Sequence, residues 1–109
     1  MIVSDDTVSK ALIYLSDDPH PVALAKKDLT DAENESERIK AEVYCEQTGS
    51  IKDKEAATDR DPRVVGAASR YSEAVFGLER HKARVRAAEM ICEIWRSEQA
   101  NVRAAERIR

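Results

Sequence analysis

The sequence predicts an all-α protein: an antiparallel coiled-coil helical hairpin with a short N-terminal helix and a short connector helix. Of the 109 residues, 36% are charged, 5% are aromatic and only three are glycines, a composition typical of long helices. Apolar residues also recur at steps of three and four along most of the chain, which is the spacing of one helix face. We expect a single helical domain over residues 1–109.

The first two helices are expected at about residues 5–16 and 19–47. Ser4 can cap the first helix, and Val8, Ala11, Leu12 and Leu15 follow at helical spacing. In the second, proline is confined to the first turn, where its missing N–H costs nothing. Apolar residues then repeat from Val22 to Val43, which gives the second helix one face to pack.

A turn and a short connector helix, at about residues 51–58, are expected next. Gly49 suits the left-handed backbone position that follows many helices. Ser50, with Asp53 three residues later, resembles a capping box at the start of a helix. The connector lets the second helix and the last helix run side by side in opposite directions.

The last helix, at about residues 61–106, is the longest element. Asp61 followed by Pro62 is a strong helix start, and an apolar seam repeats from there to Val102. Gly66 and Gly77 each cost about 1 kcal/mol relative to alanine inside a helix. We expect tight packing against a neighbouring helix to be the reason for them.

The hairpin has an expected register. If Gln47 lies near Pro62, the numbers of facing residues add to about 109, and the last helix continues past its partner after Ala88. Large exposed apolar surfaces usually mark contact sites. We therefore predict a homo-oligomer or partner interface in this overhang, made by Met90, Ile91, Ile94, Trp95 and Val102.

Charge is distributed unevenly along the chain. Residues 1–60 carry 8 Lys and Arg against 14 Asp and Glu, a net charge of −6, and residues 61–109 carry 10 against 7, a net charge of +3. Opposite charges favour pairing between the two halves. Nucleic-acid contact is the alternative for the basic face, which comprises Arg80, Arg84, Arg96, Arg103 and Arg107.

No catalytic, cofactor-binding or metal-ligating set is expected. Cys45 and Cys92 lie too far apart in this register for a disulfide, which needs Cα atoms within about 7 Å. His81 falls opposite Asp28 and is expected to be a partly buried structural residue, because no activated nucleophile accompanies it. A hydrolase that uses His81 is the least favoured function.

Two segments resemble small, largely uncharacterised helical proteins of tailed bacteriophages and prophages. The segments are Gly49-Ser50-Ile51-Lys52-Asp53-Lys54-Glu55-Ala56 and Ala88-Glu89-Met90-Ile91-Cys92-Glu93-Ile94-Trp95-Arg96-Ser97. In that group a Gly-Ser turn leads into a charged short helix, and a long helix ends in a Trp-Arg-Ser signature. The resemblance covers roughly residues 25–105 and implies an accessory role near DNA metabolism and recombination. It singles out Trp95 and Arg96 and transfers no catalytic residues.

The leading functional hypothesis is a non-enzymatic phage accessory or inhibitor protein that acts by protein–protein contact as a homo-oligomer. The alternative is a recombination accessory protein that binds single-stranded or duplex DNA through its basic face. The amino terminus, with Asp5 and Asp6 near its start, is unlike a secretory signal, and no apolar run is long enough to span a membrane. We therefore expect a cytoplasmic protein without a membrane partner.

Overall fold

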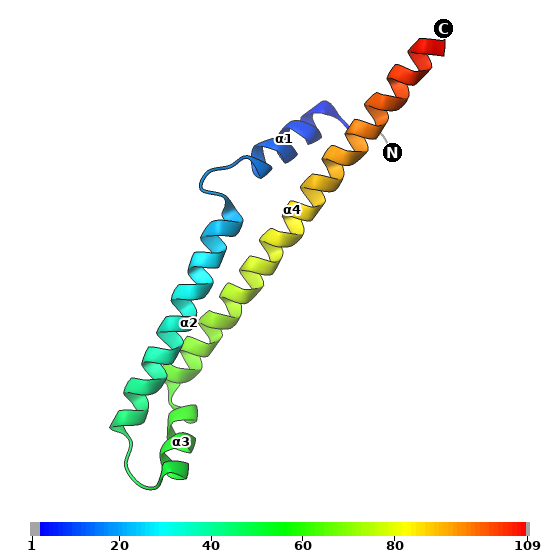
Figure 1. Cartoon of the computed structure of the whole chain (residues 1–109). Coiled ribbons are helices and arrows are strands. Elements are labelled where there is room, and N and C mark those ends of the chain that lie inside the picture. The colour runs from blue at the N-terminus through cyan, green and yellow to red at the C-terminus, as the bar shows by residue number, and fades with distance from the viewer. Residues whose placement is uncertain (1–2, 109) are drawn as a thin grey trace. The chain divides into compact units, whose positions relative to one another are not determined.

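The computed structural model describes residues 3–108, and all regular structure in that range is helical. The helices are α1 (Asp5–Leu15), α2 (Pro21–Glu46), α3 (Ile51–Arg60) and α4 (Pro62–Ile108) (Figure 1). The prediction of an all-α helical hairpin with a short N-terminal helix and a connector helix is confirmed. The ends of the helices lie within two residues of the expected ones.

Side chains at the helix starts explain these boundaries. Ser4 Oγ accepts the N–H of Thr7, and Ser50 Oγ accepts the N–H of Asp53 at 3.1 Å, as the sequence predicts. At the start of α2 the acceptor is the imidazole of His20, whose Nδ1 lies 3.0 Å from the N–H of Val22. A histidine side chain therefore satisfies one of the free N–H groups at this helix start.

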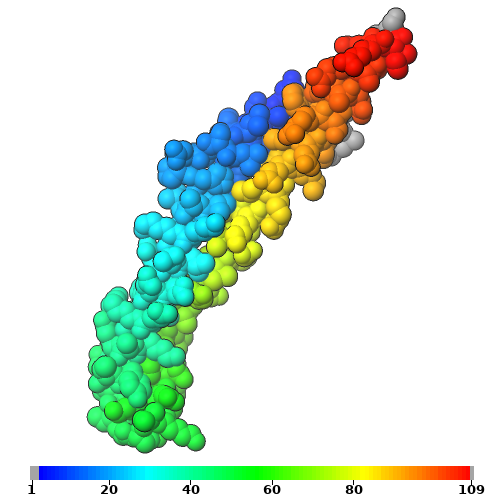
Figure 2. Space-filling view, in the orientation of Figure 1, coloured from blue at the N-terminus to red at the C-terminus, as the bar shows by residue number. Residues whose placement is uncertain are grey.

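The chain divides into two compact units. The first unit comprises Met1–Val22 and Arg80–Arg109, and in it α1 lies along the later part of α4 (Figures 1 and 2). Its core consists of Ala11 and Tyr14 of α1 with Ala88 and Cys92 of α4. Val8 and Ala11 are buried, as the spacing predicts, but Leu12 is 53% exposed and Tyr14 is buried in its place.

The second unit, Ala23–Glu79, contains the hairpin. Here α2 and the first part of α4 run antiparallel, and α3 lies at their turn (Figure 1). Arg63 pairs with Glu46 and Arg70 pairs with Glu35, so facing residue numbers add to 109 and 105. The expected register therefore holds to within one helical turn. The buried residues of this unit are Ala25, Val43, Thr58, Ala67 and Leu78.

The glycines give one confirmed prediction and one wrong one. Gly49 has a φ of +106°, the left-handed conformation that glycine adopts without strain. A Cβ atom added to Gly66 would meet only the side-chain Nη1 of Arg70, at 3.5 Å, and one added to Gly77 would meet nothing within 4 Å. Close helix packing is therefore not the reason for Gly77.

Candidate interaction surfaces

Tyr14 holds α1 against α4 in the first unit. Its ring is buried, and its hydroxyl oxygen lies 3.3 Å from both Nδ1 and the backbone oxygen of His81. The guanidinium of Arg84 lies over the ring, 4.3 Å from the ring centre, and His20 meets its edge with a centroid distance of 5.2 Å. His81 is half-buried, as expected, and its hydrogen-bond partner is Tyr14 of α1.

Helix α1 covers part of the predicted interface. Ile91 packs against the core around Tyr14, and Trp95 is half-buried with its indole N–H donating to Asp5 at 3.4 Å. Just before α1, the backbone N–H of Val3 donates to the Glu98 carboxylate at 3.0 Å. Ile91 and Trp95 therefore have a structural role inside the unit. The spacing of residues along the chain does not specify the side of α4 on which α1 docks.

The other predicted interface residues face outward to different degrees. Met90 is 61% exposed and Val102 is 51% exposed, whereas Ile94 is half-buried. From Gln99 to Ile108 every residue of α4 is exposed. No described part of the chain buries these residues, so this end of α4 gains stability if another molecule packs against it.

The five predicted basic contacts have different surroundings. Arg84 stacks on Tyr14, so it contributes to the fold of the first unit. Arg96, Arg103 and Arg107 are exposed and lie seven and four residues apart, which places them on one face of α4. No ion pair engages these three within residues 3–108. Arg80 is also exposed.

An ionic cluster closes the hairpin in the second unit. Arg63 donates to Glu46 of α2, with Nη1 and Oε1 3.1 Å apart, and to Asp61 at the start of its own helix. Hydrogen bonds from Arg63 lower the pKa of both carboxyls, and the two carboxylates raise the pKa of the guanidinium. Pairing between the acidic and basic halves of the chain, expected from the sequence, is thus present here.

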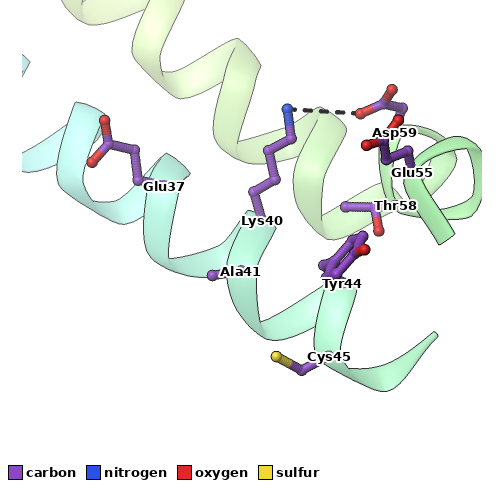
Figure 3. A pocket seen from close by; sticks show the side chains of 8 residues that line it. All are labelled: Glu37, Lys40, Ala41, Tyr44, Cys45, Glu55, Thr58 and Asp59. Carbon is purple, nitrogen blue, oxygen red and sulfur yellow. Dashed lines mark ion pairs between the residues drawn. The ribbon is translucent and has the colours of Figure 1, made fainter. Parts of the chain in front are cut away.

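A groove of 580 Å³ lies between α2 and α3 (Figure 3). Lys40 reaches across it toward Asp59 at 3.9 Å, and the hydroxyl of Thr58 donates to the backbone of Lys54. The exposed thiol of Cys45 is at its edge, but none of the lining residues is a histidine that could activate it. The lining residues are Glu37, Lys40, Ala41, Tyr44, Cys45, Glu55, Thr58 and Asp59.

A second apolar surface runs along α4 in the second unit, where no interface is predicted from the sequence. Phe76 is 68% exposed and Val65 is 55% exposed. We call this surface the Phe76 stripe; it consists of Val65, Ala68, Ser69, Ser72, Val75 and Phe76. The helical spacing of its members could have predicted this surface. The small residues among them, however, are typical of a helix side that faces solvent.

Two properties of the structure and three comparisons with known proteins bear on function. Within residues 3–108 there is no group of three His, Cys, Asp or Glu side chains that could hold a metal ion. None of the helices in the described part of the chain combines the length and apolar character needed to cross a membrane. The chain matches no protein-family model, no curated protein and no solved structure.

Proposed function

We propose that this chain is a non-enzymatic accessory or inhibitor protein that associates with copies of itself and acts by protein–protein contact. The observation that carries the proposal is the exposure of large apolar side chains in both units, including Phe76 and Met90. Burying apolar surface contributes roughly 25 cal/mol per Å². A second copy carries the same uncovered surfaces and can cover them in return.

The chemistry of the two units supports this proposal. At the hairpin turn, the charge of Arg63 is already paired with Glu46 and Asp61. The most exposed aromatic side chain of α4, by contrast, is the apolar ring of Phe76. The resemblance to small helical phage proteins extends the proposal to a phage protein that aids replication or recombination, or inhibits a host system, from the host cytoplasm.

Solution mass tests this proposal. We expect light scattering from the full chain to show a mass above that of the 12.2 kDa monomer, increasing from low to high micromolar concentration. Because apolar contacts are not screened by salt, the association should persist at high ionic strength. A monomeric mass at every concentration and salt condition would refute self-association.

A second candidate function is DNA binding, favoured by the three exposed arginines on one face of α4. If Arg96, Arg103 and Arg107 each neutralise a phosphate of duplex DNA, the logarithm of affinity should fall against the logarithm of salt with a slope of about −2.7. Replacing Arg103 and Arg107 with alanine should reduce the steepness of this slope by about 1.8. Absence of DNA binding at low salt would eliminate this function.

A further inference from the structure

We infer that the Phe76 stripe is the contact through which two copies of this chain pair, with their α4 helices antiparallel about a two-fold axis near Ser72. This inference rests on the proposed self-association and names the surface that produces it. It concerns a part of α4 that lies entirely within the second unit.

The stripe lies on the side of α4 that its own chain leaves uncovered. Arg63 and Arg70 form ion pairs with α2, so their side of α4 faces α2. Successive helix residues are rotated by about 100°, which places Ser72 roughly half a turn around the helix from Arg63 and Arg70. Helix α2 therefore cannot cover the stripe. All six residues of the stripe are exposed, and Val75 is 37% exposed.

The side chains of the stripe fit a second copy of the stripe by size. Val65, Ala68, Ser69 and Ser72 occupy positions i, i+3, i+4 and i+7, the four corners of a hole in knobs-into-holes packing. Three of these corners are small, so the hole can accept a large ring. Phe76 lies four residues after Ser72, and the centre of the hole lies about four residues before Ser72.

This spacing makes the contact reciprocal. When two stripes run antiparallel with Ser72 facing Ser72, Phe76 of each copy enters the hole of the other. Each hole is therefore filled by the same residue type, as an isologous two-fold interface requires. The pairing also sets Val75 against the small Ala68 of the second copy.

The absence of charged side chains from the stripe also favours a second copy of the chain as its partner. Between Ala67 and Leu78 the only charged residues are Arg70 and Glu73. Arg70 is already paired with Glu35, at 2.8 Å, and Glu73 lies about 100° around the helix from Ser72. A strongly charged partner would lose hydration on this uncharged surface without gaining an ion pair, whereas an identical stripe brings no charge to bury.

The size of the stripe sets the strength of the pair. Stable interfaces use about 20–30 residues from each partner, and the stripe supplies six. We therefore expect a weak dimer that dissociates on dilution in the micromolar range or above. Such a contact suits a protein whose assembly depends on its concentration.

A residue exchange tests the predicted packing. Phe76→Ala removes the knob and Ser69→Phe fills the hole, so each single variant should raise the dimer dissociation constant about tenfold or more. The double variant carries a ring at position 69 opposite a small residue at position 76, and it should return to within about threefold of the unmodified chain. Both positions are exposed, so unchanged circular dichroism will verify that the monomers remain folded.

Cysteine cross-linking tests the position of the two-fold axis. In a Cys45→Ser background, Ser72→Cys should form an intermolecular disulfide readily, because residue 72 faces itself across the axis. Glu73→Cys is the matched control, and it should cross-link at least tenfold more slowly because it points away from the axis. Equal rates at the two positions would overturn the inference.

The outcomes separate this inference from the proposed function. A chain that self-associates but whose double variant is no tighter than the single variants uses another surface, so the stripe is refuted while self-association stands. A chain that is monomeric at every concentration refutes both. Rescue by the double variant together with selective cross-linking at position 72 supports both.

Discussion

Tyr14 combines three kinds of contact in one side chain. Its ring belongs to the core between α1 and α4, its hydroxyl reaches His81, and its face carries the guanidinium of Arg84. Burial of the ring and the cation–π contact both depend on α1 being docked. At the scale of a single residue, Tyr14 is therefore the main attachment of α1 in the first unit.

Two substitutions at Tyr14 separate these contributions. Tyr14→Ala should destabilise the protein by about 3 kcal/mol, because it removes a buried ring and leaves a cavity. Tyr14→Phe keeps the ring and loses only the hydroxyl contacts, so it should cost about 1 kcal/mol. Urea unfolding followed by the fluorescence of Trp95, the only tryptophan, will measure both. Equal losses in the two variants would contradict a packing role for the ring.

Glycine substitutions should have opposite effects at two positions. Gly77→Ala places a methyl group in open space and removes a helix-destabilising residue, so it should stabilise the protein by about 1 kcal/mol. Gly49→Ala forces alanine into a φ of +106° and should destabilise the protein by about 1 kcal/mol or more. Thermal unfolding of the two variants beside the unmodified chain will show whether the midpoints move in opposite directions.

At the scale of elements, the junction between α3 and α4 depends on Asp61. Its backbone N–H donates to Thr58 at the end of α3, and its carboxylate accepts the N–H of Arg63 at 2.8 Å, which caps α4. The side chain of Arg63 then connects this carboxylate to Glu46 at the end of α2. Three helix ends are thus joined by one ionic cluster on the surface of the second unit.

The cluster predicts how two carboxyl groups titrate. Arg63 lowers the pKa of Glu46 and of Asp61, mainly through side-chain hydrogen bonds. Arg63→Gln should therefore raise both pKa values toward their ordinary range. Carboxyl ¹³C NMR titration will measure the shifts directly. Unchanged pKa values for Glu46 and Asp61 in the variant would contradict the proposed cause.

The same shifts fix the direction of the pH dependence of stability. A carboxyl whose pKa is lower in the folded state contributes stability above its unfolded pKa and loses that contribution as the pH falls through the folded pKa. The cluster should therefore stabilise the hairpin at neutral pH and cease to do so in acid. Because these side chains are exposed, the effect should be small and should decrease with added salt.

At the scale of the whole chain, the sequence predicted best what depends on local spacing. Caps such as Ser50, the turn at Gly49 and the seam along α4 are set by neighbouring residues, and the hairpin register follows from where the turn lies. The contact of Tyr14 with His81 joins residues 67 positions apart, and the docking side of α1 depends on tertiary packing that spacing does not specify. The Phe76 stripe was not predicted because serines such as Ser69 and Ser72 are typical of an ordinary solvent-facing side. Only the structure shows that the large ring of Phe76 is exposed beside them.

The division into two units predicts that the units open independently, and the two thiols can report it. Cys45 is exposed and Cys92 is buried beneath α1, so a thiol reagent should modify Cys45 rapidly and Cys92 only when the first unit opens. In a Cys45→Ser background, Tyr14→Ala should speed modification of Cys92 about tenfold or more. Val43→Ala, at a residue only 1% exposed in the second unit, should cost roughly 2 kcal/mol in that unit and leave the Cys92 rate unchanged. Acceleration of Cys92 by Val43→Ala as well would show that α4 couples both units into one cooperative opening, because the only route to that thiol would then be unfolding of the whole chain.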